Sequence, residues 1–453
     1  MKLLIKNGKI ITSNKIFNSD ILSNNGRIIQ IEKNILPKNV DKIIDASGKL
    51  IFPGGIDPHV HMHLPTPAGY SSDDFYTGSK AALFGGTTTL IDFVTPNKGQ
   101  SLCDALKKRK KEAANSLIDY SFHVSPIEWR DSLKKEIKKC IKKGITSFKV
   151  YMAYKNTIGL DDKDIYKVMK IVGKYGGIVT MHCELGDEIE KLRNAFAKEN
   201  KLSPEYHYLS RPAKLEALAV KKAIKLAKKA KCPLYIVHVS SKKSLKYIKK
   251  AQARGQTVFA ETCPQYLTLD QSKYTGDFYK VAPYIMSPPL RKHKDNKALW
   301  KAISKGVIKT VGTDHCPFTL QQKEAGIEDF RKIPNGAGGI EHRLALLYTY
   351  GVLEGKISLQ QFVNASSTNA AKIFGLYPKK GEIAIGSDAD LVVWDPNKEN
   401  KISAHNHHQN CDINIYEGIS TKGAPEFVIV NGEVAIDNGK MLKKSNGEFL
   451  RRK

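Results

Sequence analysis

Eight apolar, strand-like runs alternate with lysine-rich amphipathic stretches through the middle of this chain, and this alternation limits the possible folds more than any other feature. The runs cover residues 50–61, 87–94, 118–124, 145–151, 177–183, 233–239, 256–262 and 307–314. Strands that alternate with helices build a parallel sheet, because each helix crosses the sheet before the next strand begins. Eight repeats predict an α/β protein with a closed (β/α)8 barrel of the TIM type, whose active site lies at the carboxyl ends of the strands.

The two ends of the chain have a different pattern. Short strand-like segments of alternating polarity lie at residues 2–12, 27–33, 389–394 and 427–436. Neither end is large enough to bury a core alone, so we expect both ends to pair into one small β-sandwich domain. This predicts three segments, namely the first part of the sandwich at residues 1–53, the catalytic barrel at 54–375 and the second part of the sandwich at 376–453.

Composition excludes several classes of protein. No stretch reaches the roughly 18 consecutive apolar residues of a membrane helix, and charge interrupts the N-terminus too early for a signal peptide. Seven cysteines, widely spaced and without a Cys-x-x-Cys pair, indicate reduced thiols rather than a disulfide framework. These features predict a cytoplasmic protein without a membrane partner.

The net charge of +28 raises the alternative of a nucleic-acid binder. Phosphate binding needs clustered lysine and arginine, whereas the lysines here are spread over most of the predicted helices. No basic tract is interleaved with aromatic residues. A solvated, lysine-rich surface explains the charge, and we expect no nucleic-acid partner.

Metal-binding residue types gather at the ends of the predicted strands. His59 and His61 close the first run, and alternate residues of a strand point to the same side, so both rings can face one metal ion. The other strand ends carry Lys149, His182, His238 and Asp314. Any one of these could be a buried, hydrogen-bonded structural residue, but four imidazoles, a carboxylate and a lysine on one rim form a set that suits zinc or manganese.

A series of motifs also recurs in a recognisable order. They lie at residues 54–61 (Gly-Gly-Ile-Asp-Pro-His-Val-His), 73–75, 85–89, 147–154, 233–240, 286–291, 312–316, 333–336 and 367–374. On these motifs the chain resembles the dihydropyrimidinase and hydantoinase family of the amidohydrolase superfamily over nearly its whole length. The resemblance implies a metal-dependent hydrolase that opens dihydropyrimidine or hydantoin rings to N-carbamoyl amino acids, as in pyrimidine catabolism, and commonly works as a homotetramer or homodimer.

The resemblance also implies a set of site residues. Carbon dioxide would carbamylate Lys149 to N6-carboxylysine, because an ammonium cannot bind a cation whereas a carbamate offers two anionic oxygens. The carbamate would bridge two divalent ions per chain, zinc first and manganese or cobalt as alternatives. His59, His61 and Asp314 would complete the first metal site, and His182 and His238 the second. A hydroxide that bridges the ions would attack the ring.

Further roles follow from the same resemblance. Tyr154 would donate a hydrogen bond to the oxyanion that forms on the ring carbonyl. Asp314 would carry a proton from the attacking hydroxide to the leaving ring nitrogen. Ser287 and Asn335 match positions that bind the edge of the ring, largely through main-chain groups. Met62, Leu64 and Tyr151, which flank the ligands, are expected to line the pocket for the ring's substituent.

Two departures from the family pattern leave the exact ring open. Dihydroorotases carry an arginine two residues beyond the second metal histidine, where this chain has His63, so dihydroorotase is disfavoured. Residues 182–187 read His-Cys-Glu-Leu-Gly-Asp, where many dihydropyrimidinases have His-Ala-Glu-Asn-Gly-Asp. Allantoinase or another cyclic-ureide amidase is therefore an alternative.

A non-enzymatic alternative also exists. Collapsin response mediator proteins resemble this family throughout but have lost metal ligands. This chain has a suitable residue at all six ligand positions, which favours an enzyme.

Overall fold

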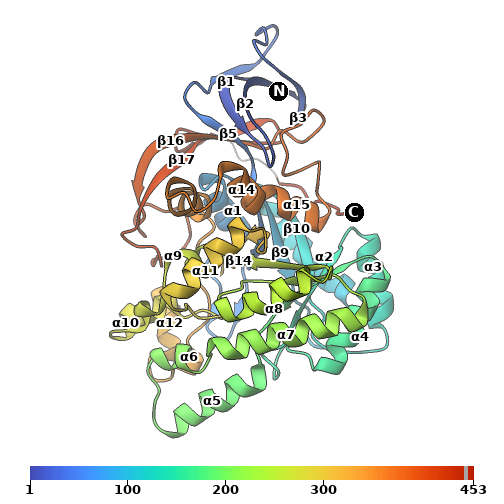
Figure 1. The fold of residues 1–453 in the computed structure, drawn as a ribbon, viewed down its shortest axis with the longest axis vertical. Helices are drawn as coiled ribbons and strands as arrows, with labels where there is room; N and C mark the ends of the chain where they lie inside the picture. The colour runs from blue at the N-terminus through green and yellow to red at the C-terminus, as the bar shows by residue number, and fades with distance from the viewer. Residues whose placement is uncertain (443–446) are drawn as a thin grey trace.

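The computed structural model describes residues 1–442 and 447–453 and shows a barrel with a separate sheet at one end of the molecule's long axis (Figure 1). The barrel strands are all parallel and follow one another in chain order around the barrel. They are β6 (Gly55–Val60), β9 (Thr87–Val94), β10 (Asp119–Val124), β11 (Ser147–Tyr151), β12 (Ile178–His182), β13 (Leu234–Ile236), β14 (Val258–Thr262) and β15 (Thr310–Val311). The predicted eight-stranded α/β barrel is confirmed.

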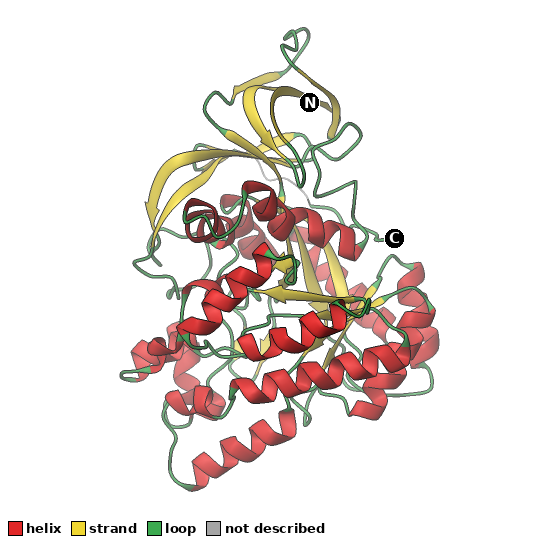
Figure 2. Cartoon of the chain, viewed as in Figure 1, coloured by secondary structure: helices red, strands yellow, loops and turns green. Residues whose placement is uncertain are grey.

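Helices pack around the outside of the barrel strands (Figure 2). The longer ones are α1 (Phe75–Phe84), α2 (Leu102–Glu112), α3 (Leu133–Lys142), α4 (Asp162–Lys174), α5 (Gly186–Lys198), α7 (Ala213–Ala230), α8 (Lys242–Gln252) and α11 (His293–Ser304). The shorter ones are α6 (Glu205–Leu209), α9 (Pro264–Thr268), α10 (Phe278–Val281), α12 (Leu320–Lys323), α13 (Arg343–Leu347), α14 (Leu359–Val363) and α15 (Asn369–Phe374). Within the described residues, none of the helices combines the length and the apolar character that crossing a membrane requires.

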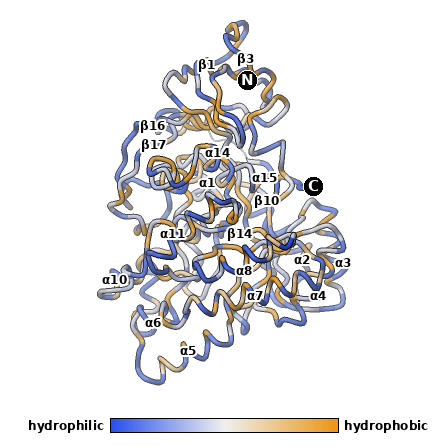
Figure 3. The backbone as a smooth tube through the Cα atoms, in the orientation of Figure 1, coloured by the Kyte–Doolittle hydropathy of each residue, from blue (hydrophilic) through white to orange (hydrophobic). Residues whose placement is uncertain are grey.

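The helices form where apolar residues recur at the helical period. In α4, for example, Ile165, Val168 and Val172 are buried against the barrel, while lysines occupy the outer face. Figure 3 shows the same division along the chain, with hydrophobic strands inside and hydrophilic stretches on the outer helices. Burial of these apolar stripes supplies the main stabilisation of the barrel wall.

Arg343 closes the barrel between its first and last strands. Its buried guanidinium donates hydrogen bonds to the carbonyl oxygens of Ile56 in β6 (2.8 Å) and Val311 in β15 (3.0 Å). Three residues farther along each of these segments, the amide of Asp314 donates to the carbonyl of His59 (2.9 Å). The closure therefore sets the end of the last strand beside the histidines of the first.

Both chain ends join one nine-stranded mixed sheet, as the sequence indicated. Its strands are β1 (Lys2–Ile11), β2 (Ile16–Asn24), β3 (Arg27–Glu32), β4 (Lys42–Asp45), β5 (Leu50–Pro53), β16 (Leu391–Lys401), β17 (Ser420–Val430), β18 (Glu433–Asp437) and β19 (Lys440–Met441). Strand β5 pairs with β1 on one side and with β16 on the other, which joins the two ends. The predicted segment boundaries stay a prediction.

The first predicted strand, residues 50–61, is divided in the structure. Residues 50–53 form β5 of the end sheet, and the barrel strand β6 begins at Gly55. Gly54 lies where the chain crosses from one sheet to the other, and a Cβ there would lie 2.1 Å from Thr88 Oγ1. Only glycine fits this crossing, so the chain can leave one sheet and enter the next within one residue.

Candidate active site

His59, His61 and Asp314 form a compact group at the rim of the barrel. Asp314 Oδ1 lies 3.0 Å from His59 Nε2 and 3.1 Å from His61 Nε2. One nitrogen from each histidine and one aspartate oxygen all lie within 4.8 Å of one another. Two imidazoles and a carboxylate at this spacing match the donor set that zinc and similar divalent ions accept.

The hydrogen bonding of His59 supports this reading. Its Nδ1 lies 2.7 Å from Glu261 Oε1, and a carboxylate can only accept, so Nδ1 carries the proton. In the neutral form of the ring, which is the form that binds a metal ion, Nε2 is then the lone-pair nitrogen, and among the described residues this buried atom has no hydrogen-bond partner. An unpaired buried nitrogen facing a carboxylate oxygen is a position that a cation would satisfy.

The charges of the group are set by burial and by the carboxylates. Burial opposes protonation of His59, but Asp314 and Glu261 outweigh it and raise the pKa of His59 to about 8. Burial prevails at His61 and lowers its pKa to about 4. Burial raises the pKa of Asp314, but His59 and His61 outweigh it and hold that pKa well below the usual range. Asp314 is thus an anion at neutral pH.

His182 and His238 form a second pair close by. His182 Nδ1 lies 2.9 Å from His238 Nε2, and the rings of His238 and His59 have centroids 5.4 Å apart. His182 Nε2 donates to Glu184 Oε2 (2.9 Å), which in turn accepts from Arg211 Nη1 (2.7 Å). Glu184 thereby holds the proton on Nε2, so the lone pair of Nδ1, which faces His238 Nε2, is the one that a metal ion could use.

Lys149 on β11 interacts electrostatically with the histidines of both groups. Its side chain is buried, and Nζ lies 4.7 Å from the centre of the Phe93 ring. The rings of His59 and His61 pack on the same phenylalanine, with centroids 4.9 Å and 4.7 Å away. Burial lowers the pKa of Lys149 to about 8, against the opposite effect of Asp314 and Glu261. More of this amine is uncharged at neutral pH than of an ordinary lysine.

The three residues expected to bind substrate also lie together. Ser287 Oγ donates to Asn335 Oδ1 (3.2 Å), and the side chain of Ser287 is close enough to influence the pKa of Tyr154. The Tyr154 ring lies 5.3 Å from the ring of His182, centroid to centroid. Burial raises the pKa of Tyr154, so its hydroxyl keeps the proton that it would donate. The structure thus brings the six predicted ligand residues and the three predicted substrate residues to one region.

The backbone is strained at this rim. Four residues have a positive φ, namely His63 (47°), Tyr154 (59°), His238 (39°) and Asp314 (56°). In the rest of the described chain, positive φ outside glycine falls on asparagines and on Lys231. Strained backbone of this kind is typical of functional sites, because the surrounding fold holds side chains where relaxed backbone would not place them.

Glu261 was not predicted from the sequence, yet it contacts both histidine groups. Besides His59, it accepts from the amide of His238 (3.0 Å) and from the hydroxyl of Tyr235 (2.7 Å). The available signal was a carboxylate at the end of the otherwise apolar run 256–262. The expectation for Met62 was wrong, because its sulfur packs against Gly78 of α1, within the core.

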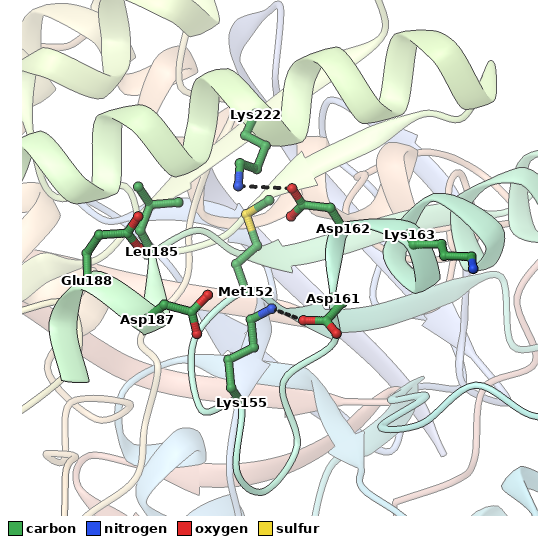
Figure 4. Close-up of a pocket in the computed structure, with 10 residues that line it drawn as sticks. Met152, Lys155, Asp161, Asp162, Lys163, Leu185, Asp187, Glu188 and Lys222 are labelled. Carbon is green, nitrogen blue, oxygen red and sulfur yellow. Dashed lines mark hydrogen bonds and ion pairs between the residues drawn. The ribbon is translucent and has the colours of Figure 1, made fainter. Parts of the chain in front are cut away.

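A hollow of about 330 Å³ lies beside the loop that carries Tyr154 (Figure 4). Its lining residues include Met152, Lys155, Asp161, Asp162, Leu185, Asp187, Glu188 and Lys222. Lys155 is paired with Asp161, and Lys222 with Asp162 at 2.9 Å. No predicted ligand or substrate residue lines this hollow, so we assign it no part in the chemistry.

A (β/α)8 barrel with histidines, a lysine and an aspartate at its strand ends defines the class of metal-dependent barrel hydrolases. This chain belongs to the amidohydrolase family, whose profile matches residues 50–435. The resemblance expected from the motifs is confirmed.

Relatives of the same kind match the chain from end to end. It is 42% identical to a D-hydantoinase of Geobacillus stearothermophilus over 100% of this chain and 97% of the relative. It is 40% identical to a dihydropyrimidinase of Rattus norvegicus over 100% of this chain and 89% of the relative. The crystal structure of dihydropyrimidinase from Brevibacillus agri has a TM-score of 0.98 at 40% identity, covering 100% of this chain and 99% of that one.

Proposed function

We propose that this enzyme hydrolyses the ring amide of dihydropyrimidines or hydantoins and releases N-carbamoyl amino acids. The observation that carries the proposal is the convergence of four imidazoles, Lys149 and Asp314 at the carboxyl end of the barrel. The full-length similarity to hydantoinases and dihydropyrimidinases supports this substrate class. The complete set of ligand types argues against a non-enzymatic interaction protein.

The proposal includes two divalent metal ions per chain, zinc first, with manganese or cobalt as alternatives. His59, His61 and Asp314 would hold one ion, and His182 and His238 the other. Lys149, carboxylated by carbon dioxide, would supply anionic oxygens between them, since its uncharged amine is the form that reacts. When bound, the ions would acidify a water molecule and polarise the ring carbonyl.

The protein's own groups supply the remaining steps. The anionic Oδ atoms of Asp314 accept a proton from the attacking water and return it to the leaving ring nitrogen. Tyr154 donates a hydrogen bond to the developing oxyanion. Ser287 and Asn335 hold the edge of the ring, which fixes the carbonyl carbon in front of the attacking oxygen.

The test is a substrate panel on purified protein, comparing dihydrouracil, substituted hydantoins, allantoin and dihydroorotate. We expect hydrolysis of dihydrouracil or hydantoins, with two metal ions per chain by elemental analysis. Chelator treatment should abolish turnover, and zinc, manganese or cobalt should restore it. Full turnover by metal-free protein would contradict the scheme.

Preference for allantoin in the same panel would favour the second candidate, another cyclic-ureide amidase. The specific observation behind that candidate is His63, which stacks on Tyr70 with ring centroids 3.9 Å apart beside the ligand His61.

We also propose a cytoplasmic homotetramer or homodimer without nucleic-acid or membrane partners. Size-exclusion chromatography with light scattering tests the oligomeric state.

A further inference from the structure

Lys323 is a fully buried lysine that the proposed chemistry does not use. It ends the short helix α12, its exposure is 0%, and Nζ donates to three carbonyl oxygens, those of Ile285 (3.0 Å), Pro334 (2.8 Å) and Gly336 (2.8 Å). An ammonium has three N–H groups, so all its donors are satisfied. In the described chain no carboxylate forms an ion pair with it, and burial lowers the pKa of Lys323 to about 7, so keeping its ammonium form without a counter-ion is costly. Such a cost calls for a role other than packing.

The three carbonyls belong to the two segments that carry the expected substrate residues. Ile285 lies two residues before Ser287, while Pro334 and Gly336 flank Asn335. The segments also contact each other directly, through Gly336 N donating to the Ile285 carbonyl (3.0 Å). Neither 285–287 nor 334–336 lies in a helix or strand, so no regular ladder fixes their spacing.

Helix α12 is itself tied to the rest of the rim. Thr319 and Gln322 form a capping box at its start. The Gln322 side-chain amide also donates to the carbonyl of Tyr70 (2.7 Å), in the hairpin of β7 (Pro65–Thr66) and β8 (Gly69–Tyr70). Lys323 therefore projects its ammonium from an anchored support, which lets it hold two irregular segments in place.

We propose that Lys323 is a positioning residue, which clamps segments 285–287 and 334–336 at the spacing that lets Ser287 and Asn335 bind the ring edge. The inference rests on the proposed function for the roles of those two residues. None of the hydrogen bonds of Lys323 reaches a metal-ligand residue. Loss of the clamp should therefore weaken substrate binding and leave the metal centre intact.

The first measurement separates binding from chemistry. Lys323→Met keeps the length of the side chain and removes the donors, so KM should rise about 10- to 100-fold because the ring is no longer held in register. Metal content should stay at the wild-type value, and kcat should fall by less than about threefold, as expected when mainly ground-state binding is lost. Lys323→Arg keeps a cation with several donors, so its KM should lie between that of Lys323→Met and that of the wild type.

Lys332→Met is the matched control. Lys332 is exposed and lies just before the second clamped segment, so this change removes the same charge from the same region without touching the clamp. Its KM, kcat and metal content should equal those of the wild type. A KM increase as large as that of Lys323→Met would show a general charge effect and overturn the proposal.

The second measurement does not depend on turnover. Hydrogen–deuterium exchange of the substrate-free protein should show faster exchange at the Gly336 amide in Lys323→Met, and no change in Lys332→Met.

If the wild type opens no cyclic amide while this exchange effect is present, the proposed function fails and the clamp stands. The clamp is overturned if Lys323→Met changes neither KM nor the exchange of the Gly336 amide. It is also overturned if Lys323→Met leaves KM unchanged but lowers kcat and metal content together. Should Lys323→Met not fold, Lys323→Gln, with two donors for three carbonyls, is judged by the same outcomes.

Discussion

Buried carboxylates determine which nitrogen of two site histidines carries the proton. Each histidine has two ring nitrogens, and only the one without a proton can bind a metal ion. Glu261 holds the proton on His59 Nδ1, and Glu184 holds it on His182 Nε2. The site is therefore organised at the level of single protons by residues that need not touch the metal ions themselves.

Glu261→Gln should weaken metal binding by about 10- to 100-fold, because the amide cannot accept hydrogen bonds at both ends and no longer fixes His59. Competition with a chelator of known affinity measures this loss. Tyr235→Phe is the control, since it removes one neutral hydrogen bond to Glu261 and leaves the His59 contact in place. Equal metal affinity in wild type and Glu261→Gln would show that Glu261 has no such role.

Lys149→Ala should fold but be almost inactive with reduced metal content, because two cations would face each other without an anion between them. Added acetate or propionate could enter the vacated space and supply two oxygens, so carboxylate plus metal should recover measurable activity. Lys149→Arg should stay inactive under the same rescue, since its fixed cation fills that space. The test is to measure steady-state hydrolysis and metal content for each variant. Near-normal turnover of Lys149→Ala with two bound ions would show that Lys149 does not bridge the metal ions.

At the level of elements, sequence pattern predicts what depends on local periodicity. The eight barrel strands fall within the predicted runs because apolar strands and amphipathic helices alternate along the chain. The break of the first run at Gly54 depends on Thr88, which lies far away in sequence. Likewise, the partners of Glu261 and Lys323 come from distant segments. Such features need the three-dimensional arrangement, which no single window of sequence contains.

The β7–β8 hairpin supplies a prediction about substrate preference. Leu64 precedes the hairpin, is half-buried and exchanges hydrogen bonds with Ser71, whose hydroxyl also donates to the carbonyl of His61 (3.1 Å). Leu64→Ala should change the relative rates among hydantoins with different substituents, because trimming this side chain enlarges the space beside the ligands. Metal content should not change. Leu353→Ala, at an exposed leucine that ends the π-helical turn Tyr348–Leu353, is the control, and equal relative rates in both variants would exclude Leu64 from the pocket.

At the scale of the whole molecule, one buried lysine joins the end sheet to the barrel. Lys380 Nζ lies 2.6 Å from Asp119 at the start of β10, 2.7 Å from Asp390 and 3.0 Å from Asp388, both just before β16. Burial lowers the pKa of Lys380, but the three carboxylates outweigh it and raise that pKa above its ordinary value. The cation is thus kept across the neutral range, and it neutralises carboxylates from both parts of the chain.

Lys380→Met should lower the free energy of unfolding by about 3–5 kcal/mol at pH 8, because three buried carboxylates lose their cation. The loss should shrink as the pH falls toward 5.5. Without Lys380 the buried aspartates have a raised pKa in the folded state, so the folded protein binds protons more readily than the unfolded chain and gains stability on acidification. Urea unfolding at both pH values measures the difference.

Lys379→Met is the control, since Lys379 is 47% exposed and 3.7 Å from Asp388, and such surface pairs contribute no more than about 1 kcal/mol. Among the described residues, the ion pairs and hydrogen bonds of Lys380 reach only Asp119, Asp388, Asp390 and Asn431, so KM should stay unchanged. A pH-independent loss equal in both variants would contradict the role of Lys380 as the buried link.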